Sequence, residues 1–342
     1  MNPDSKSPLP VVLTAYGMPH VMGYLPTRDG QLHPNPLSPT GLMDAAVEFG
    51  LAGVEFPIIG MTDAQIDALR DALQSRGLHV VADYMVIVER DCEDFCNYLR
   101  AAARLGAKVA RAMMSTILCG DRRALEGGWE ARLAEVASRL REVLPLAQDL
   151  GLCVALENHQ DATTEDFLRL HEMTDHHPAF GVTLDTGNPL SVGQEPVEAA
   201  RRLAPFIRHV HLKDYTIHFA PQGYRLVRCA AGDGVIDFAA ILDIVKRNGH
   251  KIVPGIEIAA QATRTIPLLE EQWWACYPPR HAHDLVGALR VLWRHGRPAD
   301  EPYSSAWERG ESSAVVSVEE WDRVRRSVDY FKTLLNCGGP RG

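Results

Sequence analysis

Eight short apolar segments recur along the first 260 residues, and each is followed by a segment whose apolar positions have helical spacing. The apolar segments are PVVLTAYGM, GVEFP, GLHVVADYM, KVARAMM, LCVALENH, FGVTLDTGN, IRHVHLKDY and IVPGIEIA. Continuous apolar runs are typical of parallel strands that are covered on both faces. The alternation predicts an α/β fold with a closed (β/α)8 barrel, and an open doubly wound sheet is disfavoured because no GxGxxG follows the first strand.

Boundary signals support this alternation. Serine or threonine next to proline, aspartate or glutamate marks three helix starts, at residues 38–39, 62–63 and 164–165. Glycine is the residue expected just after a helix, and it follows several of the helical segments, at Gly50, Gly77, Gly106, Gly151 and Gly249.

The pattern changes after residue 264. A segment with three of the six tryptophans is followed by a polar linker and by an expected last helix over Val318–Asn336. We therefore expect a catalytic barrel over residues 1–264 and a helical C-terminal extension over residues 265–342 that packs on the barrel or on a partner chain. Two long loops, residues 18–36 and 115–130, follow the first and fourth strands and are expected to wall the pocket, because barrel active sites lie at the carboxyl ends of the strands.

Composition narrows the class of protein. With 35 Lys and Arg against 44 Asp and Glu, the formal net charge of −9 disfavours a nucleic-acid partner, because such proteins carry a basic excess. Seven cysteines without a CxxC pair disfavour a disulfide framework and a thiolate zinc site, and favour a reducing compartment. No apolar run approaches about 18 residues, and the polar start lacks a signal-peptide core, so we expect a soluble cytoplasmic protein without membrane contact.

Four consecutive strands of the second half each end in a metal-ligand residue: Glu157, Asp185, His211 and Glu257. Each of these residues alone is more often a cap or an ion-pair partner. Three carboxylates at one barrel mouth would repel one another unless a cation lay among them, so the set together predicts a metal site. Three carboxylates and one imidazole suit Mn²⁺, Mg²⁺ or Co²⁺ and leave coordination positions for substrate oxygens.

The motifs ENH, LDTGN, HVHLKDY, GDGVIDFAAIL and GIEI, in this order over about residues 10–260, resemble the xylose-isomerase-like TIM barrel superfamily, the sugar phosphate isomerase/epimerase group. Its members include ketose 3-epimerases, hydroxypyruvate isomerases, inosose dehydratases and catalytic subunits of C-glycoside deglycosylating enzymes. The resemblance implies that the four residues bind one divalent metal, commonly Mn²⁺. It also implies that Glu157 and Glu257 exchange the substrate proton from opposite faces. The chain departs from many ketose epimerases in having Asn188 instead of a histidine after the aspartate, and in lacking an arginine in HLKDYTIHF.

Three further residues are candidates for contact with substrate. His159, two positions past Glu157, is expected in the same pocket as a general acid or base, unless it only holds a loop. Lys213 is expected to bind a substrate hydroxyl or to stabilise an enolate, unless it pairs with Asp214 or another acid. His20 is a candidate substrate contact or a loop staple, and Asn188 is a candidate substrate ligand.

The first expectation for function is a metal-dependent isomerase or epimerase of a keto sugar or related polyol, which abstracts a proton next to a carbonyl through an enediolate. The second is a metal-dependent lyase on an oxidised sugar, such as an inosose-type dehydratase or a 3-keto glycoside deglycosylating subunit. A DNA-repair endonuclease is disfavoured by the four-ligand site and the negative charge. A scaffold role with the tryptophan-rich extension as interface stays open, and we expect a homo-oligomer, with a second subunit as an alternative.

Overall fold

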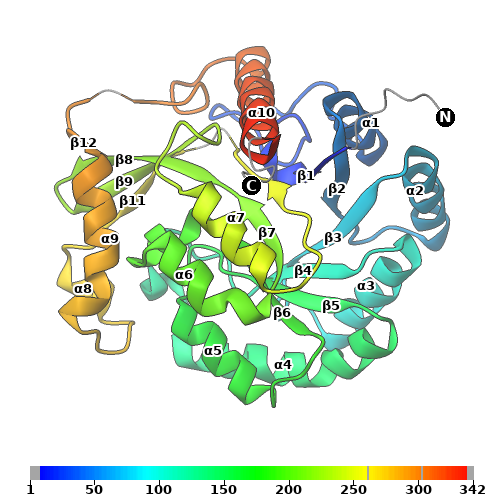
Figure 1. The fold of residues 1–342 in the computed structure, drawn as a ribbon, viewed down its shortest axis with the longest axis horizontal. Helices are drawn as coiled ribbons and strands as arrows, with labels where there is room; N and C mark the ends of the chain where they lie inside the picture. The colour runs from blue at the N-terminus through cyan, green and yellow to red at the C-terminus, as the bar shows by residue number, and fades with distance from the viewer. Residues whose placement is uncertain (1–7, 260–261, 302, 337–342) are drawn as a thin grey trace, which may run out of the picture.

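The computed structural model describes residues 8–259, 262–301 and 303–336, and eight parallel strands within them close into a barrel (Figure 1). Strand β1 is hydrogen-bonded to both β2 and β10, which closes the ring. The predicted (β/α)8 barrel is therefore confirmed. The barrel strands are β1 (Leu9–Thr14), β2 (Leu51–Pro57), β3 (His79–Val86), β4 (Val109–Met113), β5 (Cys153–Glu157), β6 (Phe180–Asp185), β7 (Ile207–Leu212) and β10 (Gly255–Ile256).

Seven helices surround the barrel, and short 3-10 turns connect several elements (Figure 1). Two of the three predicted helix starts are confirmed, because Ser38 accepts the backbone N–H of Gly41 and Thr62 forms a capping box. At the third, the capping box is formed by Thr163, one residue before the predicted Thr164. The helices are α1 (Pro39–Phe49), α2 (Asp63–Arg76), α3 (Cys92–Leu105), α4 (Trp129–Asp149), α5 (Thr164–Met173), α6 (Pro196–Leu203) and α7 (Phe238–Arg247). The 3-10 turns are η1 (Ala15–Gly17), η2 (Arg122–Ala124), η3 (Asn188–Val192) and η4 (Ala204–Phe206).

The segment between β7 and α7 contains a hairpin that was not among the eight predicted strands, formed by β8 (Asp214–Ala220) and β9 (Gly223–Cys229). Two strands of the C-terminal extension, β11 (Arg264–Ile266) and β12 (Gly296–Arg297), pair with this hairpin and complete a four-stranded sheet. The apolar run IRHVHLKDY is correspondingly divided at Lys213. Apolar and polar residues alternate along the hairpin, so its strands lack the continuous apolar runs of the barrel strands.

The C-terminal extension lies against both the sheet and the barrel. Helices α8 (Glu271–Trp274) and α9 (Ala282–His295) flank the four-stranded sheet, and α10 (Ser313–Asn336) lies near α1 and α7 (Figure 1). Trp321 of α10 contacts Phe49, and Phe331 contacts Phe238, with ring centroids 6.2 and 5.1 Å apart. Helix α10 begins at Ser313 rather than at the expected Val318, because its first turn, residues 313–316, contains neither glycine nor proline and buries Val316.

Two expectations from composition can be compared with the described residues. Six of the seven cysteines lie within them and all six are free thiols, whereas Cys337 lies outside the described residues. Within the same ranges, the model contains no helix that combines the length and the apolar character needed to cross a bilayer.

Candidate metal centre

The carboxyl ends of four neighbouring strands bring Glu157, Asp185, His211 and Glu257 together at the barrel mouth. Each offers one ligand atom, and the four atoms lie within 4.8 Å of one another. Glu157 and Asp185 end β5 and β6, His211 is the penultimate residue of β7, and Glu257 directly follows β10. Parallel register places His211 beside Asp185 on one side and beside Gly255 on the other. The side chains proposed as ligands are thus neighbours, and we call them the four-residue cluster.

The cluster contains two polar atoms that need a cation. His211 Nδ1 and Glu257 Oε2 lie 2.6 Å apart, yet neither atom has a hydrogen bond of acceptable geometry. The Glu257 side chain is 13% exposed, and those of Glu157 and Asp185 are fully buried. Unpartnered donor atoms that face one another in a buried, oxygen-rich site are what a hard divalent cation requires, so the residues present fit such an ion.

Glu55 of β2 orients the histidine of the cluster. Its carboxylate lies 2.9 Å from His211 Nε2 and 2.8 Å from His209 Nε2. In the neutral imidazole, with Nε2–H donating to Glu55, the lone pair of His211 would be on Nδ1, which lies 2.6 Å from Glu257 Oε2 in the cluster. Burial disfavours the imidazolium, but the charges of Glu55 and Glu257 outweigh it and raise the pKa of His211 to about 10.

A buried arginine holds the opposite side of the cluster. Arg111 of β4 donates from Nη1 to Asp83 Oδ1 at 2.7 Å, and its Nη2 forms an ion pair with Glu157. Burial raises the pKa of Asp83 to about 6, although Arg111 opposes this shift. Arg111 therefore fixes one oxygen of Glu157, and the other oxygen accepts a hydrogen bond of 3.3 Å from Asn188 Nδ2.

Lys213 lies beside the four-residue cluster and pairs with acids other than Asp214, as the ion-pair interpretation of the sequence allowed, and its contact with substrate stays a prediction. Its Nζ forms an ion pair with Asp185 and lies 3.3 Å from Glu257 Oε1. The alternative partner Asp214 instead accepts backbone N–H groups of Gly232, Gly234 and Ile236. Burial would lower the pKa of Lys213, but the charges of Asp185 and Glu257 raise it, so Lys213 is a cation at neutral pH.

His159 and Asn188 also lie beside the cluster, in different roles. The His159 Nδ1 atom is buried without a hydrogen-bond partner. Burial, with the charges of Lys213 and Arg111, lowers the pKa of His159 to about 3, so its imidazole is neutral at neutral pH. Besides its bond to Glu157, Asn188 donates its backbone N–H to Asp185 Oδ1 at 3.1 Å. Asn188 thus contacts two residues of the cluster directly.

His20 has the contacts of a loop staple. Its Nδ1 lies 2.9 Å from the carbonyl oxygen of Leu25, and its Nε2 lies 2.8 Å from Ser313 Oγ. Its backbone N–H donates to Glu320 of α10 at 3.1 Å. The side chain is buried, and both ring nitrogens are engaged, so the structure gives no support to a contact between His20 and substrate.

The sequence interpretation missed Glu55, Asp83 and Arg111. Each is a charged residue inside an otherwise apolar strand, in GVEFP, VVADYM and VARAMM. A buried charge is costly unless it is paired, so an isolated charge within such a run is a signal of a polar network that could have found them.

We predict that Glu55→Gln weakens Mn²⁺ binding by about 10- to 100-fold, because residues that orient a ligating histidine contribute that much to metal affinity. Isothermal titration calorimetry on the purified variant measures the change. Glu320→Gln is the matched control, since Glu320 is a buried carboxylate that binds the backbone N–H groups of His20 and Val21. An unchanged affinity in Glu55→Gln would show that Glu55 does not orient the ligand.

Metal binding is also predicted to release a proton from His211. The pKa of about 10 in the metal-free protein means that the imidazole is protonated below this pH and must lose its proton to bind. The affinity for Mn²⁺ should therefore rise about tenfold per pH unit between pH 6 and 9. Calorimetry in HEPES and in Tris at equal pH measures the released proton, and identical heats in the two buffers would contradict the prediction.

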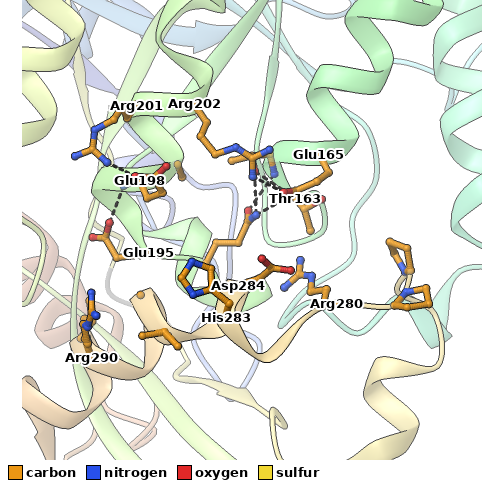
Figure 2. Close-up of a pocket in the computed structure, with 18 of the residues that line it drawn as sticks. Thr163, Glu165, Glu195, Glu198, Arg201, Arg202, Arg280, His283, Asp284 and Arg290 are labelled. Atoms are coloured by element: carbon orange, nitrogen blue, oxygen red, sulfur yellow. Dashed lines mark hydrogen bonds and ion pairs between the residues drawn. The ribbon is translucent and has the colours of Figure 1, made fainter.

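A separate cavity of about 780 Å³ lies between α5, α6 and α9, and Figure 2 shows the charged side chains that line it. Arg202 forms an ion pair with Glu165, and Arg201 forms one with Glu198. The lining contains no residue of the four-residue cluster. Two of the lining arginines are thus paired with carboxylates, whereas Arg280 Nη2 is buried without a hydrogen bond.

Comparison with known proteins gives three relatives in sequence. The uncharacterized protein YihM of Escherichia coli is 24% identical over 212 residues, which are 60% of this chain and 61% of YihM, less than two thirds of its length. The 3-oxo-isoapionate decarboxylase of Pectobacterium atrosepticum is 24% identical over 228 residues, 64% of this chain and 77% of that protein. An inosose dehydratase of Clostridium botulinum is 26% identical over 238 residues, 60% of this chain and 78% of that protein.

Solved structures share the fold at lower identity. A D-psicose 3-epimerase in the presence of D-fructose has a TM-score of 0.59 and 14% identity, covering 88% of this chain and 94% of that chain. The IOLI protein with a bound zinc atom has a TM-score of 0.52 and 15% identity, covering 86% and 99%. A family model described as xylose isomerase-like TIM barrel matches residues 43–273. With the barrel in place and most of the chain matched, the chain belongs to the xylose isomerase-like TIM barrel family.

Proposed function

We propose that this protein is a divalent-metal-dependent enzyme that isomerises or epimerises a keto sugar or a related polyol. The observation that carries the proposal is the four-residue cluster, in which two glutamates from different strands lie on either side of one histidine. Glu257 Oε2 is 2.6 Å and Glu157 Oε1 is 3.6 Å from His211 Nδ1. When bound, a divalent ion, Mn²⁺ by preference, would supply Lewis-acid stabilisation of the charge that develops on the substrate carbonyl.

Glu257 is the stronger candidate for proton abstraction. Burial would raise its pKa, but Lys213 and His211 hold the pKa of Glu257 well below its usual range, so the carboxylate is ionised. It is also the most exposed member of the cluster, and one of its oxygens lacks a hydrogen bond. Abstraction of the proton next to the carbonyl by Glu257 would give an enediolate and a protonated Glu257. An epimerisation then requires Glu157 to enter the cycle protonated, so that it gives its own proton to the other face and ends as the carboxylate.

Lys213 and His159 complete the proposed site. The Lys213 ammonium would donate a hydrogen bond to the substrate oxygen that gains charge. The neutral imidazole of His159, with its free Nδ1, would bind a substrate hydroxyl rather than act as a strong base. Homo-oligomer formation, a second subunit and a cytoplasmic location stay predictions.

Elimination is the second candidate function, because two relatives in sequence are named as a decarboxylase and a dehydratase. Dehydration and decarboxylation both involve a carbanion next to the carbonyl. In dehydration the carbanion forms by loss of a proton and then expels hydroxide, whereas in decarboxylation it forms by loss of CO₂. Incubation with Mn²⁺ and ketoses in D₂O, followed by NMR, separates isomerisation from elimination. Deuterium at the carbon next to the carbonyl, with the carbon skeleton and all oxygens retained, supports isomerisation; loss of water supports elimination. Absence of both would overturn the proposed function.

A further inference from the structure

Two arginines lie side by side on one face of the four-stranded sheet. Arg228 of β9 is directly opposite Tyr215 of β8, and Arg264 of β11 is directly opposite Leu226 of β9. Opposite residues in an antiparallel pair share a face, as do residues two apart on one strand. Tyr215, Leu226, Arg228 and Arg264 therefore occupy the same face, with the two arginines as diagonal neighbours.

This face covers the barrel mouth. The Tyr215 hydroxyl donates to Asn188 Oδ1 at 3.4 Å, and Asn188 Nδ2 in turn donates to Glu157. The Tyr224 hydroxyl, on the same face, donates to the carbonyl of Leu190 in η3. Because Arg228 is directly opposite Tyr215 on this face, the arginine pair lies on the side of the sheet that contacts the barrel mouth.

The charge of Arg264 has no carboxylate partner within the described parts of the chain. Its Nε is buried without a hydrogen bond, and its Nη1 reaches only the carbonyl of Ala262, at 3.4 Å. Burial and the neighbouring Arg228 lower the pKa of Arg264. A partly buried guanidinium without a carboxylate partner is costly, and an anion bound to Arg264 beside Arg228 would supply that partner.

We propose that the substrate carries an oxyanion, a carboxylate or a phosphate ester, which Arg228 and Arg264 bind while its keto and hydroxyl oxygens face the four-residue cluster. This inference rests on the proposed function and names its substrate class: an acidic derivative of a keto sugar. Guanidinium groups suit this role because they bind carboxylate and phosphate oxygens through paired N–H donors. The anion would also orient the sugar, which selects the carbon that loses its proton.

The test uses three sugars that differ only at carbon 6: D-fructose, D-fructuronate and D-fructose 6-phosphate. Calorimetry on the Mn²⁺-loaded protein should give at least about tenfold tighter binding for one of the two anions than for D-fructose. A preference for fructuronate or for the phosphate identifies the oxyanion. Equal affinities, including undetectable binding of all three, would overturn the inference.

Matched variants locate the anion site. Arg264→Met and Arg228→Met should each remove the preference, while Mn²⁺ binding and D-fructose binding stay within about twofold of wild type. Arg225→Met is the control, because Arg225 lies on the opposite face of β9, beside His218 and Thr265, and should keep the preference. A preference that survives in both Arg228→Met and Arg264→Met would also overturn the inference.

Failure of the inference and failure of the proposed function are distinguishable. Deuterium exchange into a ketose without any preference for anions would leave the function standing and remove the anion site. The opposite result is a preference for anions that depends on the two arginines, without deuterium exchange or elimination in any sugar. It would support the anion site and overturn the proposed isomerase or epimerase function.

Discussion

Replacement of Glu257 by glutamine is expected to abolish turnover and to weaken Mn²⁺ binding by about 100-fold or more. The substitution keeps the size of the side chain but removes the negative charge beside His211 and Lys213, at 2.6 and 3.3 Å. It also removes the carboxylate proposed as the base, so the rate of deuterium exchange should fall by about 10³- to 10⁴-fold even at saturating metal. Calorimetry measures the metal affinity, and NMR in D₂O measures the exchange rate.

Glu320→Gln controls for the loss of a buried carboxylate elsewhere in the chain. Glu320 binds the backbone of the loop after β1 and is not part of the cluster, so this variant should keep wild-type metal affinity and exchange. Mn²⁺ binding by Glu257→Gln with wild-type affinity would remove Glu257 from the ligand set. A scaffold function would leave the two variants indistinguishable in every assay.

Arg111→Met is expected to destabilise the fold by about 3–5 kcal/mol, because removal of one partner from a buried ion pair leaves the other charge uncompensated. Arg111 is 4% exposed and joins Asp83 to Glu157. Urea denaturation followed by circular dichroism measures the free energy of unfolding. A loss smaller than about 1 kcal/mol would show that these charges are compensated in another way.

Two companion variants keep this prediction testable if Arg111→Met does not fold. Arg111→Lys retains the charge and should lose less stability. Asp83→Asn in the Arg111→Met background removes one of the two carboxylates left without a partner and should restore part of the lost stability.

The pKa of Asp83, about 6, is above its value of about 4 in an unfolded chain, so the folded state binds the extra proton between these pH values. The stability contribution of Asp83 therefore falls as pH rises from about 4 to 6, and this slope should vanish in Asp83→Asn.

The barrel and the four-residue cluster were predictable from the sequence for a shared reason. Parallel strands covered on both faces need continuous apolar runs, so a polar residue at the end of such a run stands out. Glu157, Asp185 and His211 each stand out in this way, and the repeat of strand and helix places successive strand ends at the same rim. The pattern of neighbouring residues was therefore enough to predict the structure where strands that are consecutive in the sequence are also neighbours in the barrel.

The remaining features depend on contacts that local pattern does not contain. The β8–β9 hairpin is completed by β11 and β12, which come later in the chain, so its alternating pattern resembles a polar loop when seen alone. Glu55 meets His209 and His211 only because the barrel closes, and the His20 side chain is bound by Ser313 of α10. Neither partnership has a signature within a window of neighbouring residues.

The stoichiometry of Mn²⁺ in the wild-type protein, measured by equilibrium dialysis after removal of all metal, tests the central claim most directly. The structure predicts one ion per chain, bound with an affinity that falls when any one of Glu157, Asp185, His211 and Glu257 is replaced. The claim would be contradicted if the wild-type protein bound no Mn²⁺, Mg²⁺ or Co²⁺. It would also be contradicted if Glu257→Gln and Asp185→Asn each bound one ion with wild-type affinity.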